Sequence, residues 1–179
     1  INLREDRQGL QRLKEAAESV VEQYGTSCSG SRFMNGTLDL HEQLEAELAE
    51  FVGREAALCY TNGYQTNLGA ISALLDKGDH IISDKYNHAS IMDAIFLTTG
   101  MKRNISLHRY KHNNLPELEK ILKKIPRNAG KMIVTDGVFS MEGDIAFLPQ
   151  IRELADKYKA AVYLDEAHAI GVLGETGRG

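Results

Sequence analysis

The sequence has little of what marks several protein classes. Among its 179 residues there is no tryptophan, and there are only two cysteines and three prolines. Cys28 and Cys59 lie far apart and match no metal-ligand spacing. We therefore expect two free thiols, no metal site and a reducing compartment.

Charged and apolar residues are not concentrated either. The formal net charge is −4 with no block of one sign behind it, which argues against a nucleic-acid partner or an anionic membrane surface. No apolar run approaches the roughly 20 residues of a membrane span, and residues 1–9 are too charged for a secretory signal. These absences predict a cytoplasmic protein without an integral membrane segment. Its 42% of hydrophobic residues is enough for the core of a globular domain.

Two helices are predicted near the N-terminus. Apolar residues recur at helical spacing over residues 10–24, and again from Asp39 until Gly53. A loop rich in glycine and serine, residues 25–32, follows the first helix.

Short apolar runs then alternate with amphipathic stretches. Such alternation predicts parallel strands with crossover helices, and nearly all-apolar strands are typical of a sheet that is covered on both faces. The expected fold class is therefore α/β, a three-layer αβα arrangement with a mostly parallel sheet. The strands are predicted at 56–60, 80–83, 105–110, 131–135 and 160–164, and the helices at 64–75, 90–99, 116–125 and 148–159.

Polar residues follow each predicted strand. In open parallel sheets, ligands bind beyond the carboxyl ends of the strands, so these turns are the place to look for a site. A polar turn is common after any strand, but five at one edge of a sheet predict a ligand site. The five turns are 61–64, 84–88, 112–114, 136–140 and 165–168.

Asp165 and His168 carry the strongest chemical signal. Asp165 ends an apolar strand, where a carboxylate stays charged only beside a cationic or hydrogen-bonding partner. The protonated ring nitrogen of pyridoxal phosphate (PLP) is such a partner, and His168 is placed to hydrogen-bond the phenolate oxygen of the ring. The simpler alternative is a capped turn with a surface imidazole.

Residues 165–168, Asp-Glu-Ala-His, also match the nucleotide-handling box of a class of helicases. That interpretation requires a phosphate loop, G-x-x-x-x-G-K-[ST], but the only Gly-Lys pair, Gly130-Lys131, is followed by Met132. The G-x-G-x-x-G fingerprint of dinucleotide sites is missing as well. Both nucleotide interpretations are therefore disfavoured.

Three further turns offer groups that suit PLP. The N–H groups of Gly63 and Tyr64, at the start of a predicted helix, form a potential phosphate cradle. His88 can lay its imidazole on an aromatic ring, and Ser140 can donate a hydrogen bond to the cofactor. Each residue, taken singly, is also explained as an ordinary turn residue.

With these residues in view, the chain closely resembles the α-oxoamine synthases, a branch of the fold-type I PLP enzymes. The resemblance runs from about Leu13 to Gly179. Its carriers are 30–32, 38–45, 62–64, 87–90, 135–144, 165–168 and 174–179.

The resemblance implies a set of site residues. His88, Asp165 and His168 would be catalytic, and Gly63, Tyr64, His88, Ser140, Asp165 and His168 would bind PLP. It also implies that Gly30–Arg32 lies near an active site built at the interface of a homodimer. Residues 1–36 would form an N-terminal helix and loop, and residues 37–179 would belong to the large, PLP-binding domain.

The implied reaction is the decarboxylative condensation of an amino acid with an acyl-CoA. In this family the lysine that forms a Schiff base with PLP would lie beyond Gly179, so we expect this chain by itself to be inactive. Two alternatives remain open: another fold-type I PLP enzyme of the aminotransferase or aldolase class, and a non-catalytic binding or assembly module.

Overall fold

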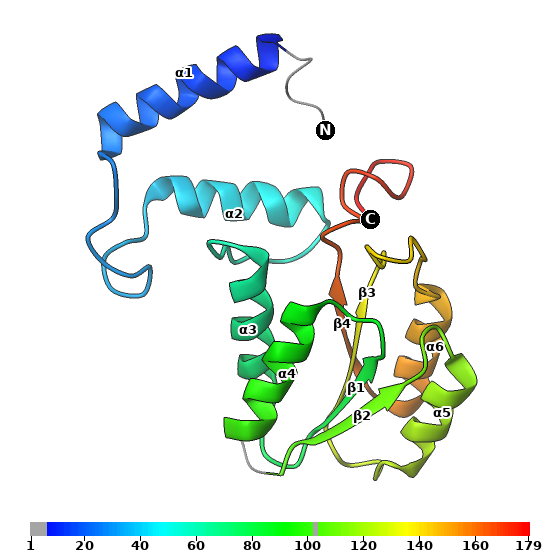
Figure 1. Ribbon diagram of the computed structural model, residues 1–179. Coiled ribbons are helices and arrows are strands. Elements are labelled where there is room, and N and C mark those ends of the chain that lie inside the picture. Colours follow the sequence, from blue (N-terminus) through cyan, green and yellow to red (C-terminus); the bar gives the residue numbers. More distant parts are fainter. Residues whose placement is uncertain (1–6, 102–103) are drawn as a thin grey trace. The chain divides into compact units, whose positions relative to one another are not determined.

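The computed structural model describes residues 7–101 and 104–179. The chain divides into two compact units, Ile1–Cys59 and Tyr60–Gly179, and Figure 1 labels the elements of each. Within the described ranges, no helix is both long and apolar enough to cross a membrane. The predicted domain boundary between residues 36 and 37 stays a prediction.

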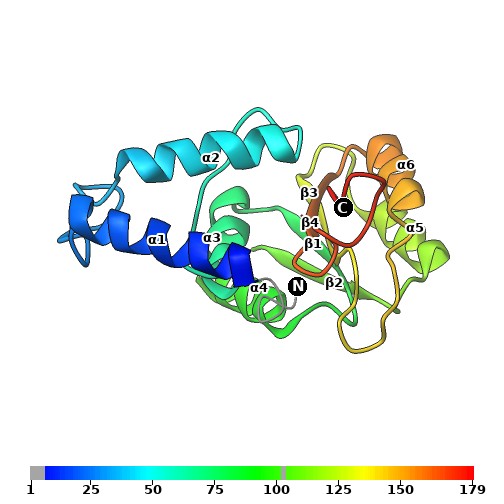
Figure 2. The same cartoon turned by 90° about the horizontal axis from the view of Figure 1, so that it is seen from above.

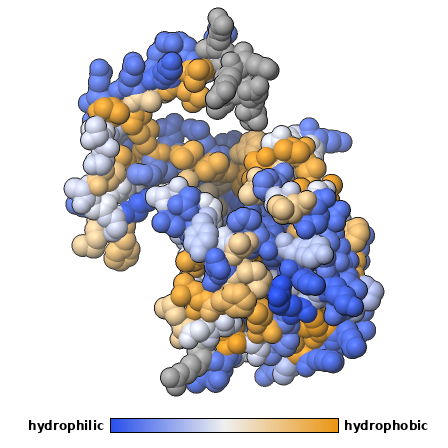
Figure 3. Space-filling model, viewed as in Figure 1, coloured by the Kyte–Doolittle hydropathy of each residue, from blue (hydrophilic) through white to orange (hydrophobic). Residues whose placement is uncertain are grey.

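The first unit contains the two predicted helices, α1 (Arg7–Tyr24) and α2 (Asp39–Phe51). The backbone of Gly53, just beyond α2, has a φ of +64°, a left-handed conformation that glycine adopts without steric cost and that commonly ends helices. Apolar residues of α1 are exposed, and hydrophobic side chains are visible along this helix in Figure 3. Leu13 is 54% and Val21 49% exposed.

An ion pair joins the glycine- and serine-rich loop to α2, and hydrogen bonds with both partners hold the segment before Tyr60. The guanidinium of Arg32 pairs with the carboxylate of Glu45, which also accepts the backbone N–H of Cys59 at 2.7 Å. Arg32 also donates to the carbonyl of Cys59 at 3.3 Å. The hydrogen bonds from Arg32 and then from Cys59 lower the pKa of Glu45 to about 2.

This contact corrects one predicted element. Residues 56–60, expected to form a strand, have an irregular backbone. The side chains of Glu45 and Arg32 take the N–H and carbonyl of Cys59, the groups that a strand would offer to a neighbour. The prediction was wrong here because apolar composition alone does not supply a pairing partner.

The second unit is built on a four-stranded sheet of order β2-β1-β3-β4. All three strand pairs are parallel, as predicted. The strands are β1 (His80–Asp84), β2 (Ser106–Tyr110), β3 (Lys131–Asp136) and β4 (Ala161–Asp165). The helices are α3 (Gly63–Leu74), α4 (Ala89–Met101), α5 (Leu115–Lys124) and α6 (Leu148–Tyr158).

Helices cover both faces of this sheet, which confirms the three-layer fold (Figures 1 and 2). Because side chains alternate along a strand, neighbouring residues of β1 enter different cores. Ile81 packs with Ile71 of α3 and Ile91 of α4. Ile82 packs with Leu118 of α5 and Ile151 of α6.

The strand order reverses between β1 and β3. From β1 the chain passes through α4 to β2 on one side, whereas from β3 it passes through α6 to β4 on the other. The two crossover helices lie in the two different cores. Such a reversal leaves a crevice beyond the carboxyl ends of the two strands, where ligands bind in open α/β sheets.

Candidate active site at the carboxyl edge of the sheet

Three aspartates end three of the four strands of this sheet. Asp84 ends β1, Asp136 ends β3 and Asp165 ends β4, and Asp136 and Asp165 are register partners. His88 follows β1 and His168 follows β4. The fold therefore brings residues from distant parts of the sequence to one edge, as predicted from the turns.

Asp165 is half-buried, and two hydrogen bonds hold its carboxylate. Its Oδ1 accepts the backbone N–H of Ala167 at 3.0 Å, and its Oδ2 accepts Nδ2 of Asn67 at 2.9 Å. An ionised carboxylate has about four lone-pair positions. Asp165 is therefore fixed in orientation and still able to accept a further donor.

Asn67 ties Asp165 to two other elements. This residue of α3 is 4% exposed, and its Nδ2 also donates to the hydroxyl of Ser90 on α4 at 2.8 Å. Its Oδ1 accepts the hydroxyl of Tyr163 on β4 at 2.7 Å. Burial, and then the charge of Asp165, raise the pKa of Tyr163 to about 12. The hydroxyl thus remains a donor over the whole physiological range.

His88 is held through its backbone and one ring nitrogen. Its N–H donates to Oδ2 of Asp136 at 2.8 Å, and its Nδ1 lies 2.7 Å from Oγ of Ser90. The imidazole itself is exposed. The arrangement suits a ring that stacks on a ligand bound at this edge of the sheet.

The pKa of Asp136 depends on the charges of the residues around it. It is 7% exposed, and desolvation raises the pKa of its carboxyl to about 6 despite the hydrogen bond from the His88 backbone. The charge of Asp165 raises this pKa further, whereas those of His88 and His168 lower it. Asp136 is thus in electrostatic reach of the predicted catalytic residues.

The start of α3 provides the predicted phosphate cradle. Gly63 and Tyr64 lie in the first helical turn, where N–H groups have no partner within the helix. Asn62 caps the helix by accepting the N–H of Gln65 at 2.9 Å. A Cβ built on Gly63 would meet no heavy atom within 4 Å, so no other side chain packs against this glycine.

This cradle lies near Asp165 because Asn67, which contacts Asp165, is one helical turn beyond Gly63. Four residues of α-helix rise by about 6 Å. The hydroxyl of Tyr64 points elsewhere and donates to Asp93 of α4 at 3.0 Å. Any role of Tyr64 in binding an anion therefore belongs to its backbone.

The structure does not place Ser140 and His168 as firmly. Both side chains are exposed, and the charge of His168 lowers the pKa of Asp136. Ser140 lies in a turn that is closed by the hydrogen bond from Gly143 N to Phe139 O at 2.8 Å. Their assignments stay predictions.

A second polar cluster supports the turns at this edge. The ring of His112 bridges Oδ1 of Asp84 and Oδ2 of Asp144, each at 3.1 Å, and stacks on Tyr86 with a centroid separation of 4.6 Å. Burial lowers the pKa of His112, but the two carboxylates outweigh it and raise that pKa. The cluster links the turns after β1, β2 and β3.

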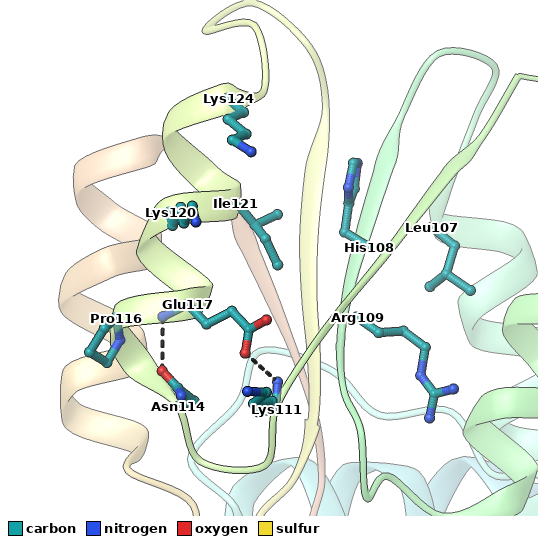
Figure 4. Close-up of a pocket in the computed structure, with 10 residues that line it drawn as sticks. All are labelled: Leu107, His108, Arg109, Lys111, Asn114, Pro116, Glu117, Lys120, Ile121 and Lys124. Carbon is teal, nitrogen blue, oxygen red and sulfur yellow. Dashed lines mark hydrogen bonds between the residues drawn. The ribbon is translucent and has the colours of Figure 1, made fainter.

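A cavity of about 680 Å³ lies elsewhere, between β2 and α5. Figure 4 shows the hydrogen bonds from Glu117 N to Asn114 and from Lys111 N to Glu117, which hold the turn between the two elements. Asn114 and Glu117 thus stabilise this turn, and the residues that line the cavity do not include those around Asp165.

Sequence reasoning did not assign a site role to Asn67, Ser90 or Asp136. A signal existed for Asn67, which lies four residues before the buried Ile71 and is the polar member of an apolar helical face. Ser90 and Asp136 gave no such signal, because their partners are known only once the elements have packed.

The residues present fit PLP. Asp165 has acceptor capacity for a protonated ring nitrogen, and the helix start at Gly63 and Tyr64 presents N–H groups that have no partner inside the helix and suit a phosphate. His88 lies between these residues in the sequence, and its exposed ring is at the same edge of the sheet.

Comparison with known proteins is consistent with this chemistry. The serine palmitoyltransferase of Bacteroides thetaiotaomicron is 50% identical over 171 residues, which are 96% of this chain and 42% of that protein. The 8-amino-7-oxononanoate synthase of Thermoanaerobacter pseudethanolicus is 48% identical over 169 residues, which are 94% of this chain and 42% of that protein. The chain thus spans about two fifths of the length of these relatives.

A solved structure gives the same result. Serine palmitoyltransferase from S. paucimobilis, a variant with bound PLP and myriocin, superposes with a TM-score of 0.87 at 38% identity, over 94% of this chain and 41% of that one. Residues 2–178 match the family described as aminotransferase class I and II. The chain belongs to this family, and the relatives that it resembles, serine palmitoyltransferase and 8-amino-7-oxononanoate synthase, are both α-oxoamine synthases.

Proposed function

We propose that this chain is the cofactor-binding part of a PLP-dependent enzyme that condenses an amino acid with an acyl-CoA. The observation that carries the proposal is the fixed carboxylate of Asp165 at the end of β4, which accepts a hydrogen bond from Asn67, one helical turn beyond the donor-rich start of α3. The two named relatives support the same class of reaction.

The proposed roles follow the family resemblance, and the contacts described above support those of Gly63, His88 and Asp165. Gly63 and Tyr64 bind the phosphate through their N–H groups, and Asp165 accepts a hydrogen bond from the ring nitrogen. His88 lies on the ring face, and His168 and Ser140 reach the ring oxygen and the cofactor. Bound PLP would supply an acceptor for the electrons that are left at the substrate α-carbon.

The overall reaction balances without an oxidant. The amino acid, the acyl thioester and one proton give an α-amino ketone, carbon dioxide and free CoA. One carbon–carbon bond forms while the carboxyl carbon–carbon bond and the thioester bond break.

We also propose the type of enzyme within the family, the compartment and the oligomeric state. Residues 30–41 and 63–69 look most like serine palmitoyltransferase, with glycine C-acetyltransferase and 8-amino-7-oxononanoate synthase next. We propose a cytoplasmic homodimer in which Gly30–Arg32 lies near the active site.

The test uses the full-length protein, with the Schiff-base lysine expected beyond Gly179. The protein is loaded with PLP and incubated with serine, glycine or alanine, each with and without an acyl-CoA, and the products are identified by mass spectrometry. Release of CoA with an amino ketone whose mass reflects the loss of carbon dioxide supports the proposal.

The alternatives give different products. A keto acid without acyl-CoA would establish an aminotransferase, and an aldehyde would establish an aldolase. A protein that shows neither a visible absorbance band with PLP nor turnover would be a non-catalytic module.

A further inference from the structure

We propose that Asn67 is a positioning residue that fixes the carboxylate of Asp165 and, through Ser90, the tautomer of His88. The effect of Asn67 on catalysis rests on the proposed function. The directions of the hydrogen bonds among these residues do not. The residues come from α3, α4, β4 and the turn after β1.

Three partners determine the orientation of the Asn67 amide. Oδ1 accepts from the hydroxyl of Tyr163 at 2.7 Å, and Nδ2 donates to Ser90 at 2.8 Å and to Asp165 at 2.9 Å. A flipped amide would turn its oxygen toward the carboxylate of Asp165, which has no proton to donate when ionised. The two N–H groups of the amide are therefore both used.

The direction of the next hydrogen bond follows from this orientation. Oγ of Ser90 accepts from Asn67, so its own proton is available for Nδ1 of His88 at 2.7 Å. The backbone N–H of Ser90 approaches the same nitrogen at 3.2 Å, and an N–H can only donate. Nδ1 of His88 is therefore the acceptor, and the neutral ring carries its proton on Nε2.

Burial strengthens the hydrogen bonds of Asn67 and Ser90. Asn67 is 4% and Ser90 2% exposed, so water competes poorly for their hydrogen bonds. One buried amide thus sets both the angle of the Asp165 carboxylate and the acceptor state of His88. These are the two residues assigned to the ring nitrogen and the ring face.

The first readout needs no cofactor. Nitrogen NMR of the cofactor-free full-length protein, labelled at histidine and assigned with His88→Gln, is expected to show His88 with a proton on Nε2 and none on Nδ1. Ser90→Ala loses the hydroxyl donor and keeps only the longer hydrogen bond from the backbone N–H, so the Nδ1 signal is expected to move part of the way toward that of a ring that exchanges between tautomers. A proton on Nδ1 in the wild type, or an unchanged signal in Ser90→Ala, would overturn the inference.

The second readout is kinetic. Asn67→Asp keeps the shape of the side chain but replaces its donor with a carboxylate oxygen that faces Asp165. We expect kcat to fall about 10–100-fold, the range seen when outer partners of site residues are removed, while KM for the amino acid changes less than threefold. Ser90→Ala, which keeps the local volume, is expected to lower kcat by a smaller factor.

Ile71→Val is the matched control on the same buried face of α3. It perturbs packing without touching the hydrogen bonds, and it should leave kcat and the His88 signal unchanged. If the wild type is active and a folded Asn67→Asp protein keeps the full kcat, the positioning role is disproved and the proposed function stands. An inactive wild type would disprove the proposed function, and the NMR result would still decide the hydrogen-bond order.

Discussion

At the residue scale, the three strand-end aspartates differ in what remains free on each carboxylate. Asp84 is fully buried and accepts hydrogen bonds from Tyr86 and Asn113 while it contacts His112. Asp136 is buried with a raised pKa. Asp165 has one partner on each oxygen and is half-buried, which leaves it the best placed to receive a ligand.

The first prediction concerns Asp165→Asn in the full-length protein. The amide keeps the shape of the side chain but loses the charge that stabilises a protonated ring nitrogen, so kcat is expected to fall by on the order of 100-fold or more. PLP affinity, measured by fluorescence titration, should change much less because the phosphate cradle is intact. Glu166→Gln removes the same charge one residue away and should keep its turnover. Unchanged turnover in Asp165→Asn would remove this residue from its role.

The second prediction is the pH dependence that Asp136 gives to stability. The folded-state pKa of about 6 lies above the ordinary 3.8, so the folded state holds this proton more tightly than the unfolded state. The contribution of protonated Asp136 to the free energy of unfolding is complete below pH 3.8 and is lost as the pH rises through about 6.

Asp136→Asn does not titrate and keeps an acceptor for His88. Relative to the variant, the cofactor-free wild type should therefore lose on the order of 2 kcal/mol between pH 4 and pH 7. Urea unfolding of both proteins at several pH values measures this difference. A difference that stays constant with pH would contradict the assigned pKa.

At the element scale, the end of α6 is held in a conformation that its residue does not favour. Lys159 has a φ of +54°, and Ala160 N donates to Ala155 O at 2.8 Å beyond it. Left-handed backbone costs a residue with a side chain about 1 kcal/mol, and glycine avoids this cost. The chain still turns at Lys159 because β4, which follows α6, must pair with β3.

The third prediction follows from this conformation. Lys159→Gly is expected to raise the free energy of unfolding by up to about 1 kcal/mol. Glu153→Gly, in the middle of the same helix on its exposed side, should lower it by about 1 kcal/mol. Chemical denaturation of both variants should give opposite signs, and destabilisation by Lys159→Gly would refute the explanation.

At the scale of the whole molecule, the second unit holds the site and the first unit offers an apolar surface. Leu10, Leu13, Val20 and Val21 of α1 are all more than a third exposed. An amphipathic helix whose apolar side is at the surface is typical of an interaction site. This surface supports the proposed homodimer.

The fourth prediction tests that assembly. The full-length protein is expected to be a dimer by light scattering, and Leu13→Glu, which places a charge on the apolar side of α1, should shift it toward the monomer. Gln8→Glu adds the same charge at an exposed polar position and should leave the dimer intact. A dimer that is unaffected by Leu13→Glu would exclude this surface of α1 as the interface.

Local pattern determined most of the second unit. The strands around Ile81 and Val134 and the helices between them were predictable because the period of apolar residues is set within each segment. The position of Asp165 at a strand end was predictable for the same reason. From a parallel sheet it then follows that the polar turns share one edge.

Tertiary structure decided what depends on partners far away in the chain. The run at 56–60 is apolar enough for a strand, but Glu45 and Arg32 take the polar groups of Cys59. Asn67 and Asp165 are separated by 98 positions, and no period in either segment pairs them. The sequence by itself determined which elements form and which edge carries the chemistry, because those are local properties. Only packing decided which donors fix the carboxylate, because a hydrogen bond depends on where both partners lie in space.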